Sequence, residues 1–332
     1  MELNEIISQR VEKLKSFKEA GMDPYGQKFN KTCFIKELLS SFKENERVLL
    51  AGRLMAKRKH GKVCFADLRD QDSRLQLYVR MNDPLGSEEF ELFNKLDIGD
   101  IIGVEGQTFK THTGEPTLKV TKFVLLSKSL RPLPEKWHGL KDIQIRYRQR
   151  YVDLVANPEV KEIFVLRSKI ISSLRDFLNQ RGFLEVETPM MHVIPGGAAG
   201  RPFQTHHNEY NMDLFLRIAP ELYLKRLIVG GFEKIYEINR SFRNEGVSTR
   251  HNPEFTMLEL YAAYCDYEDM IKITQEIFVH VAQSVLGKLE FEYQGKHIDL
   301  TPPWPRRSFQ EAVRSKFGID PQDDAPTMIE KL

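Results

Sequence analysis

Hydrophobic residues recur every three or four positions over the first twenty residues of the chain. This spacing is typical of a helix with one apolar face, and Gly21 follows where a glycine commonly ends a helix. Acidic residues are mixed into the polar face, which disfavours a helix lying on a membrane. The pattern therefore predicts an amphipathic helix that packs on the next domain. Its apolar positions are Leu3, Ile6, Ile7, Val11, Leu14 and Phe17.

Between residues 48 and 126 the pattern changes to short stretches in which hydrophobic and polar residues alternate. Turn residues at 59–62, 70–73 and 113–116 help to separate five such stretches, which favours strands over helices. Five short strands predict a small barrel, and an OB-fold is the natural candidate. The exposed strands and loops of that fold bind single-stranded nucleic acid through aromatic rings and basic side chains.

Basic, aromatic and amide side chains occur together in this region. The basic cluster consists of Lys57, Arg58, Lys59 and Lys62. Phe65 and Gln76 follow on the next two predicted strands. Taken singly, each feature has a simpler explanation, since a phenylalanine is usually a core residue and a Lys-Arg run is usually a solvated turn. Together they predict a face of the barrel that binds nucleic acid.

Pro132 and Pro134 predict an extended linker after the barrel, because each proline biases its predecessor away from helix. An Arg and Tyr run at 146–151 then opens the second domain, either as an RNA-binding patch or as a packing element. Apolar spacing over residues 160–180 predicts a long helix ended by Gly182, and residues 183–189 predict a strand. We place the first domain at residues 1–130, the linker at 131–148 and the second domain at 149–332.

Residues 232–264 predict two antiparallel strands joined by a long polar loop, because β-branched and aromatic residues recur along both arms. A period of two divides the second arm into two faces. The core face consists of Thr256, Leu258, Leu260 and Ala262. The opposite face consists of Phe255, Met257, Glu259 and Tyr261.

Charged and aromatic side chains converge on this hairpin. A carboxylate on a half-buried sheet face is costly unless a positive group meets it, so Glu245 and Glu259 beside Arg243 predict the floor of a ligand-binding site. For a lone glutamate, a solvated ion pair would be the simpler explanation. The number of such residues favours a site, and they are Arg243, Glu245, His251, Asn252, Phe255, Glu259 and Tyr261.

A glycine-rich loop at residues 194–200 lacks the Gly-Lys-Ser/Thr ending of a P-loop. Gly196 and Gly197 are better explained as positions where the backbone approaches a small ligand closely. Further on, a predicted strand enters a helix whose first turn holds Glu221, a position that the helix dipole alone would explain. A metal site at residues 205–208 is disfavoured, since no cysteine or carboxylate cluster stands in ligand spacing.

Composition and charge narrow the class of protein. The 332 residues are 41% hydrophobic, enough for two or three domains, and a net charge of +2 excludes a global basic field. Cys33, Cys64 and Cys265 are widely spaced and odd in number, which argues for a reducing compartment, by default the cytoplasm, and against disulfides or a thiolate zinc site. No targeting sequence and no apolar run long enough to span a membrane is visible.

Residues 242–245 (FRNE) and 250–256 (RHNPEFT) resemble motif 2 of the class II aminoacyl-tRNA synthetases, and residues 257–261 (MLELY) resemble its lysyl type. The predicted long helix and the strand ending at Pro189 resemble motif 1, which builds a twofold dimer interface in that family. The resemblance covers nearly the whole chain and favours packing for the Arg and Tyr run. It implies an α+β protein with an N-terminal helix, an OB-fold anticodon-binding β-barrel and an antiparallel-sheet catalytic domain.

The resemblance also implies ATP-dependent attachment of lysine to tRNA(Lys) through a lysyl-adenylate, with Mg²⁺, by a homodimer. It implies that Arg243 is catalytic and bridges the lysine carboxylate and the α-phosphate. The implied amino-acid-binding residues are Gly197, Glu221, Arg243, Glu259 and Tyr261. The implied ATP-binding residues are Arg243, Glu245, His251, Asn252 and Phe255. The implied anticodon-binding residues are Arg58, Phe65, Gln76 and Glu115.

The third motif of class II enzymes, a glycine-rich segment with an arginine entering a helix, has no match between Tyr264 and Leu332. That region carries the family's metal-binding carboxylates, so we expect no metal ligands in this chain and expect a fragment that is inactive alone. One alternative is an aspartyl or asparaginyl type of synthetase, which Glu221 and Glu259 disfavour. The other is a non-catalytic tRNA-binding paralogue or fragment, which the missing motif favours and an intact Arg243 opposes.

Overall fold

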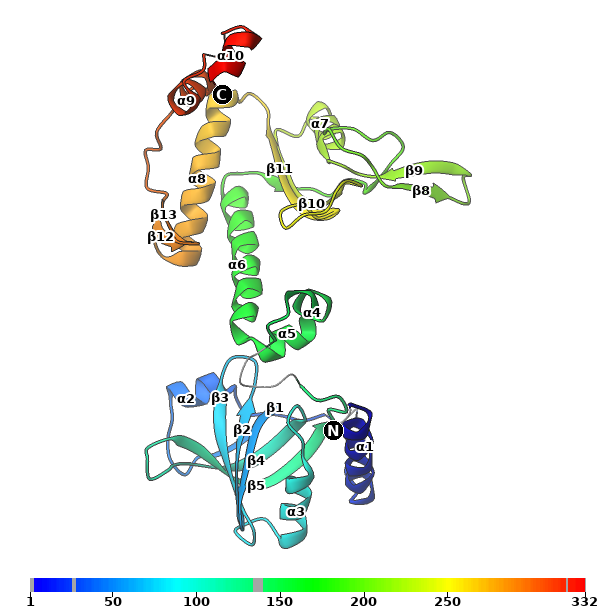
Figure 1. Ribbon diagram of the computed structural model, residues 1–332, viewed down its shortest axis with the longest axis vertical. Helices are drawn as coiled ribbons and strands as arrows, with labels where there is room; N and C mark the ends of the chain where they lie inside the picture. Colours follow the sequence, from blue (N-terminus) through cyan, green and yellow to red (C-terminus); the bar gives the residue numbers. More distant parts are fainter. Residues whose placement is uncertain (1–2, 26–27, 134–139, 321, 332) are drawn as a thin grey trace. The chain divides into compact units, whose positions relative to one another are not determined.

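A computed structural model describes residues 3–25, 28–133, 140–320 and 322–331 (Figure 1). The chain divides into two compact units, Met1–Val160 and Lys161–Leu332. Residues 134–139 of the predicted linker lie outside the described residues, and its last six residues form helix α4 (Ile143–Arg148). That helix begins because Asp142 Oδ1 accepts a hydrogen bond from Ile145 N at 2.9 Å. The predicted boundaries at residues 130 and 148 stay predictions.

Five strands of the first unit close into a barrel in the order β1-β2-β3-β5-β4. β3 and β5 are parallel, and the other neighbours are antiparallel. The barrel predicted from the alternating stretches is therefore confirmed. Its strands are β1 (Arg47–His60), β2 (Val63–Arg69), β3 (Arg74–Arg80), β4 (Ile101–Lys110) and β5 (Pro116–Ser127).

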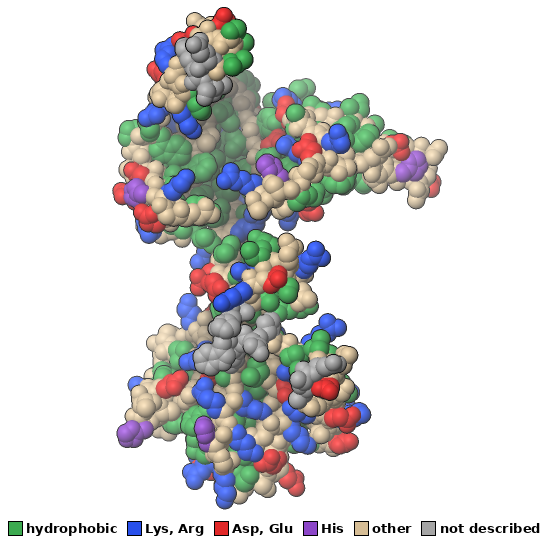
Figure 2. Space-filling model, in the orientation of Figure 1, with side chains coloured by type: hydrophobic (Ala, Val, Ile, Leu, Met, Phe, Trp, Pro, Cys, Tyr) green, Lys and Arg blue, Asp and Glu red, His purple; other side chains and the backbone are tan. Residues whose placement is uncertain are grey.

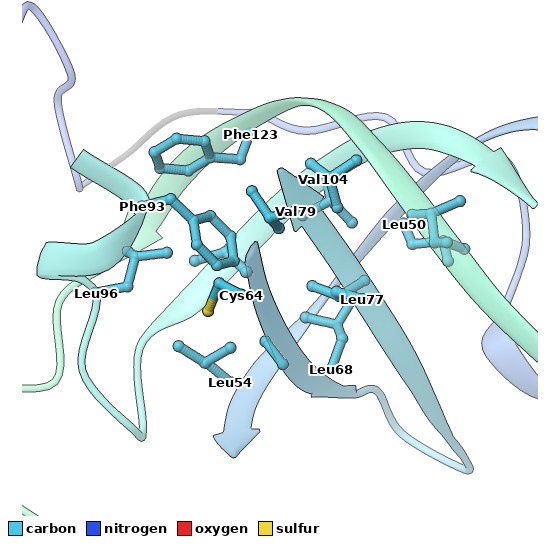
Figure 3. Packing of buried hydrophobic residues seen from close by; sticks show 14 of the residues in the cluster. Leu50, Leu54, Cys64, Leu68, Leu77, Val79, Phe93, Leu96, Val104 and Phe123 are labelled. Atoms are coloured by element: carbon cyan, nitrogen blue, oxygen red, sulfur yellow. The ribbon is translucent and has the colours of Figure 1, made fainter. Parts of the chain in front are cut away.

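Alternate side chains of the strands fill the barrel (Figure 3). On β2, Cys64 and Leu68 are fully buried, and α3 (Ser87–Lys95) adds the buried rings of Phe90 and Phe93. The Phe93 ring lies edge-on to Phe123, with 5.2 Å between centroids. Each such side chain contributes about 1.5–3 kcal/mol when removed from water, so the barrel has a core of its own.

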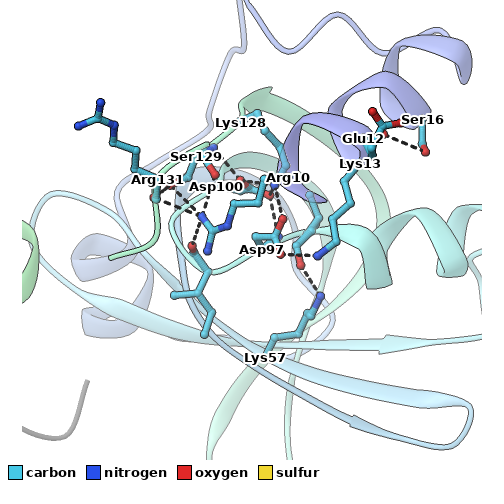
Figure 4. Close-up of polar contacts among 12 residues, drawn as sticks. Arg10, Glu12, Lys13, Ser16, Lys57, Asp97, Asp100, Lys128, Ser129 and Arg131 are labelled. Carbon is cyan, nitrogen blue, oxygen red and sulfur yellow. Dashed lines mark hydrogen bonds and ion pairs between the residues drawn. The ribbon is translucent and has the colours of Figure 1, made fainter. Parts of the chain in front are cut away.

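The predicted N-terminal helix is confirmed as α1 (Leu3–Glu19), and Gly21 after it has a left-handed φ of 77°. It packs on the barrel through the buried ring of Phe17. Arg10, only 8% exposed, adds a polar attachment that the sequence pattern did not predict (Figure 4). Its guanidinium donates hydrogen bonds of 2.8–3.4 Å to the backbone oxygens of Ile98, Ser129 and Arg131.

The second unit contains the predicted hairpin, formed by β10 (Lys234–Phe242) and β11 (Glu254–Ala262). The strand predicted at residues 183–189 is much shorter, since β6 (Leu184–Glu185) pairs with β10 over two residues only. Thr188 directs its N–H and hydroxyl to the Glu237 side chain, at 3.3 and 2.7 Å, instead of to a strand. Pro189 then has no N–H to continue the ladder.

Two helices cover one face of the β11-β10-β6 sheet. α6 (Pro158–Gln180) is the predicted long helix, and Gly182 follows its end with a φ of 78°. With α8 (Tyr267–Leu286) it packs on Leu258, Leu260 and Ala262, which confirms the predicted core face of β11. The side chains of Phe255, Met257, Glu259 and Tyr261 therefore lie on the side away from these helices.

The remaining elements are short. A second sheet of the second unit has the order β7-β9-β8, and α7 (Glu221–Val229) follows it. No helix in the described ranges is long and apolar enough to cross a membrane. The other elements are α2 (Ile35–Ser40), α5 (Arg150–Ala156), β7 (Met191–His192), β8 (Gln204–His207), β9 (Met212–Leu216), β12 (Glu290–Tyr293), β13 (Lys296–Asp299), α9 (Phe309–Phe317) and α10 (Ala325–Lys331).

Candidate active site and nucleic-acid interface

Three pairs of residues face each other across β10 and β11 on the side of the sheet away from α6 and α8. Side chains alternate along a strand, so all six residues share this face, which we call the floor. The pairs are Glu237 with Glu259, Asn239 with Met257, and Ser241 with Phe255. The floor therefore runs from a carboxylate end to an aromatic end.

The carboxylate end of the floor brings Glu221, Glu259 and Tyr261 together. The Tyr261 hydroxyl donates to Glu259 Oε2 at 3.0 Å, and Glu221 begins α7, which packs on both strands. Burial raises the pKa of Glu259, the Tyr261 hydrogen bond opposes this, and Glu221 and Glu237 raise it further. Burial, followed by the Glu259 carboxylate, also raises the pKa of Tyr261. Lys225 forms an ion pair with Glu221, so Glu259 is the carboxylate here that an ammonium group of a ligand would neutralise.

Arg217 and Glu237 form a buried ion pair at the carboxylate end of the floor. The sequence did not predict this pair. Arg217, 1% exposed, donates from Nη1 to Glu237 Oε1 at 2.7 Å and from Nε to the Arg240 backbone oxygen at 2.8 Å. The Thr188 hydroxyl donates to the other oxygen of Glu237. The sequence does carry a signal, because Arg217 and Glu237 stand in the apolar segments LFLRIAP and KIYEIN, where an unpaired charge would be costly.

The glycine-rich loop lies against both Glu221 and Arg243. Gly197 has a φ of 88°, and a Cβ on it would lie 2.9 Å from the Glu221 Cβ. A Cβ on Gly200 would lie 3.2 Å from the Arg243 Cδ. At Gly197 only glycine allows this approach, whereas at Gly200 the flexible Arg243 side chain would have to shift slightly. The loop therefore lies between the carboxylate end of the floor and the arginine.

Arg243 follows the last residue of β10 and lies at the aromatic end of the floor. Its Cζ is 5.2 Å from the centroid of the Phe255 ring, and its backbone N–H donates to the Pro253 oxygen at 2.9 Å. Its Nε is buried and has no hydrogen-bond partner in the part of the chain that the structure describes. In those same residues no carboxylate forms an ion pair with it, so its charge is available to a ligand.

The other predicted nucleotide-binding residues lie on the loop between the two strands and are exposed. Glu245 Oε1 accepts a hydrogen bond from Arg201 N at 3.1 Å, and His251 Nδ1 lies 2.9 Å from Ser248 Oγ. Across the described residues, no hydrogen bond or ion pair joins Glu245, His251 or Asn252 to the floor. The structure thus brings Arg243 and Phe255 together, whereas Glu245, His251 and Asn252 do not contact the floor through hydrogen bonds or ion pairs in the described residues.

No group of three or more His, Cys, Asp or Glu side chains lies close enough to hold a metal ion within the described ranges. His206 Nδ1 does lie 2.9 Å from Asp213 Oδ1 on the β8–β9 hairpin, but both side chains are about half exposed. The described residues therefore do not fit a resident metal site.

The predicted anticodon-binding residues lie together on the outside of the barrel. Phe65 alternates with the buried residues of β2 and is half-buried, and its ring lies 5.4 Å from that of Tyr78. Gln76 Nε2 donates to Glu115 Oε2 at 3.2 Å. Phe65 thus lies outside the buried cluster that fills the barrel, and its role in binding stays a prediction. Arg58 lies in register with Phe65 on the neighbouring strand.

Two residues that the sequence did not single out connect this face. Asp67, 6% exposed, lies 3.7 Å from Arg58 and 3.3 Å from Arg74, and Arg74 lies 3.6 Å from Glu115. Lys57 was wrongly placed in the exposed basic cluster, because its Nζ donates to the Asn94 and Leu96 backbone oxygens at the end of α3. Burial lowers the pKa of Lys57.

On the visible face of the barrel, basic side chains do not form one continuous positive patch. On the face shown in Figure 2, Lys and Arg side chains are scattered over the strands with acidic side chains among them. This agrees with the net charge of +2.

Two family models match these two regions of the chain. The model described as tRNA synthetases class II (D, K and N) matches residues 142–330, and the model described as an OB-fold nucleic acid binding domain matches residues 48–126. Since the first match covers more than half of the chain, the chain belongs to the class II tRNA synthetases of the D, K and N group. The predicted α+β architecture of helix, OB-fold barrel and synthetase sheet is confirmed.

Within this class, three curated relatives that the chain resembles are each named lysine–tRNA ligase. The chain is 60% identical over 321 residues to that of Carboxydothermus hydrogenoformans, covering 96% of this chain and 66% of that protein. It is 60% identical over 321 residues to that of Pelotomaculum thermopropionicum (96% and 63%) and 57% identical over 327 residues to that of Moorella thermoacetica (98% and 66%). The chain thus spans slightly less than two thirds of the length of these relatives.

Proposed function

We propose that the protein uses ATP to attach lysine to tRNA(Lys) through a lysyl-adenylate. The observation that carries this proposal is the floor. At one end Glu259 forms no ion pair with the described residues, and at the other end Arg243 has no carboxylate partner among them. A cationic amino acid gains from Glu221 and Glu259, whereas an aspartate or asparagine substrate does not. The names of the relatives agree with this choice.

In the first step, a lysine carboxylate oxygen bonds to the α-phosphorus of ATP, the bond from that phosphorus to the bridging oxygen breaks, and pyrophosphate leaves. Arg243 binds the lysine carboxylate and the α-phosphate, because a guanidinium donates to two oxyanions at once. Negative charge grows on the phosphoryl oxygens in the transition state, so this contact lowers the barrier. Glu221, Glu259 and Tyr261 bind the amino acid, with Gly197 close to it.

ATP lies over the aromatic end of the floor. Phe255 stacks on the adenine ring, Glu245 and Asn252 hold the base and nearby groups, and His251 contacts the outer phosphates. The exposure of Glu245, His251 and Asn252 on one loop supports their assignment, because the loop is open to a ligand. Magnesium accompanies ATP as its counter-ion. Since the described residues do not fit a metal site, we assign no step to it.

In the second step, a hydroxyl of the terminal ribose of the tRNA attacks the lysyl carbonyl carbon, and AMP leaves. The barrel binds the anticodon. Phe65 stacks on a base, Gln76 and Glu115 contact base edges, and Arg58 contacts a phosphate or a base. Their position on one outer face of the barrel supports this assignment.

We also propose a twofold homodimer that acts in the cytoplasm. The support for the dimer is a run of apolar side chains on α6 that are exposed in this structure. These are Ile163 (65% exposed), Phe164 (45%), Val165 (45%) and Leu166 (37%). A surface of this kind commonly lies in a subunit interface.

Amino-acid-dependent exchange of pyrophosphate into ATP by the full-length protein tests the proposal. We expect exchange with lysine and with no other standard amino acid. Exchange with aspartate or asparagine would assign the protein to the other synthetases of its group. A protein that binds tRNA(Lys) but exchanges with no amino acid would be the non-catalytic paralogue.

A further inference from the structure

Two N–H groups on the floor and at its aromatic end are buried without a partner. One is the Nε of Arg243, and the other is the Nδ2 of Asn239, a residue that is 8% exposed. Neither atom donates to any of the residues that the structure describes. Arg243 already has a role in the proposed reaction, whereas Asn239 has none.

Asn239 occupies the middle of the floor. It faces Met257, with the Glu237–Glu259 pair on one side and the Ser241–Phe255 pair on the other. It therefore lies between the residues proposed for the amino acid and those proposed for the nucleotide. The Ser241 hydroxyl donates to Asn239 Oδ1 at 3.4 Å, which leaves Nδ2 as the free donor of the amide.

The acceptors nearest along the floor are already engaged. Glu237 receives hydrogen bonds from Arg217 and Thr188, and Glu259 receives one from Tyr261. Met257 has no strong acceptor in its side chain. A buried donor without a partner costs about 1–3 kcal/mol, and bulk water does not reach this one. None of the described residues therefore supplies the acceptor, which leaves a bound ligand or a trapped water to do so.

We propose that Asn239 is a substrate-binding residue whose Nδ2 donates a hydrogen bond to an oxyanion at the junction of the amino-acid and nucleotide subsites. The proposal rests on the proposed function, which supplies two such oxyanions, the carboxylate of the amino acid and the α-phosphate of ATP. Asn239 and Arg243 then bind the reacting groups together, the amide from the centre of the floor and the guanidinium from its end.

The test compares wild type with Asn239→Leu, a substitution of similar size that removes the donor. Lysine alone and ATP alone are titrated calorimetrically into the full-length protein, and thermal unfolding is recorded without ligand. We expect the Kd for lysine, for ATP or for both to rise about tenfold to a hundredfold, the loss expected for a hydrogen bond to a charged group. The melting temperature shows whether the variant folds. Loss of the unpaired amide raises it, and loss of the acceptor of the buried Ser241 hydroxyl lowers it.

Each outcome has one meaning. A higher Kd for lysine alone identifies the carboxylate as the acceptor, and a higher Kd for ATP alone identifies the α-phosphate. Unchanged affinity for both ligands overturns the proposal, whatever the melting temperature, and leaves the amide bound to a trapped water. Asn239→Ala decides the question in the same way if the leucine variant does not fold. Asn208→Ala, an exposed asparagine in the β8–β9 turn, is the matched control and should change nothing.

The titrations also separate this proposal from the proposed function. If wild type binds ATP and an amino acid other than lysine, the lysine assignment fails. Asn239 is then judged on ATP and on the amino acid that does bind. If wild type binds lysine and ATP and the variant binds them equally well, only the role of Asn239 fails.

Discussion

The guanidinium carbon of Arg243 lies 5.2 Å from the centre of the Phe255 ring. The arginine side chain lies against the ring and against Gly200, and neither contact neutralises its charge. Glu245, two residues further along the chain, accepts a hydrogen bond from Arg201 N instead, and Glu259 lies at the other end of the floor. An arginine held in this way is organised before the substrates arrive.

Replacing Arg243 should therefore affect the rate of adenylate formation more than the affinity for lysine. We expect Arg243→Ala in the full-length protein to lower the single-turnover rate at least about a hundredfold, comparable to the loss of one preorganised donor to an oxyanion. Arg243→Lys keeps the charge but loses the planar pair of donors, so it should recover little.

The matched control for this prediction is Arg240→Ala. Arg240 lies three positions earlier on β10, and its side chain is exposed and forms an exposed ion pair with Glu254 at 3.5 Å. Its loss should leave the rate within about twofold, since such surface pairs contribute less than about 1 kcal/mol. A near-normal rate for Arg243→Ala would show that Arg243 does not act in adenylate formation and that the hairpin has only a structural role.

Because the pKa of Glu259 is raised, we expect its replacement by glutamine to stabilise the protein and to weaken lysine binding. Burial makes the ionised form less favourable in the folded protein than in the unfolded chain. This cost is absent below the ordinary value of 4.5 and grows as the pH rises through the raised value in the folded protein. Glu259→Gln should therefore raise the melting temperature at about pH 7.5 and leave it unchanged at about pH 4. It should also weaken lysine binding at least about tenfold.

Glu254→Gln is the control for Glu259→Gln, because Glu254 begins the same strand and is exposed. It should change neither the pH dependence of unfolding nor the Kd for lysine. A stabilisation by Glu259→Gln that persists undiminished at about pH 4 would show that the carboxylate charge is not its cause.

The faces of the hairpin could be predicted because a strand has only two faces, and Leu258 and Leu260 decide which one is buried. The network of Asp67, Arg74 and Glu115 could not, because its Arg74–Glu115 contact depends on the pairing of β3 with β5, two strands that are far apart in sequence. Lys57 shows the same limit. Its hydrogen-bond partners lie at the end of α3, and the sequence near Lys57 does not predict that contact.

The half-buried ring of Phe65 predicts a role in RNA binding that is separate from catalysis. Phe65→Ala should weaken tRNA(Lys) binding by about 1–3 kcal/mol, the contribution of one stacked base, and should leave adenylate formation unchanged. Binding is measured by fluorescence anisotropy at one fixed salt concentration, since phosphate contacts depend strongly on salt. Unchanged binding together with a lower melting temperature would show that the ring only packs against Tyr78.

The Arg217–Glu237 pair predicts a strong coupling between two buried residues. Removing one partner leaves an uncompensated buried charge, so Arg217→Met and Glu237→Gln should each lower the free energy of unfolding by about 3–5 kcal/mol. The double variant leaves no such charge and should be more stable than the sum of the single effects by about 1–3 kcal/mol, measured by urea unfolding at neutral pH. Strict additivity would show that the two charges do not stabilise each other. Because the backbone oxygen of Arg217 also accepts from Phe242 N at 2.9 Å, each single variant should loosen the end of β10 and so raise the Kd for lysine as well.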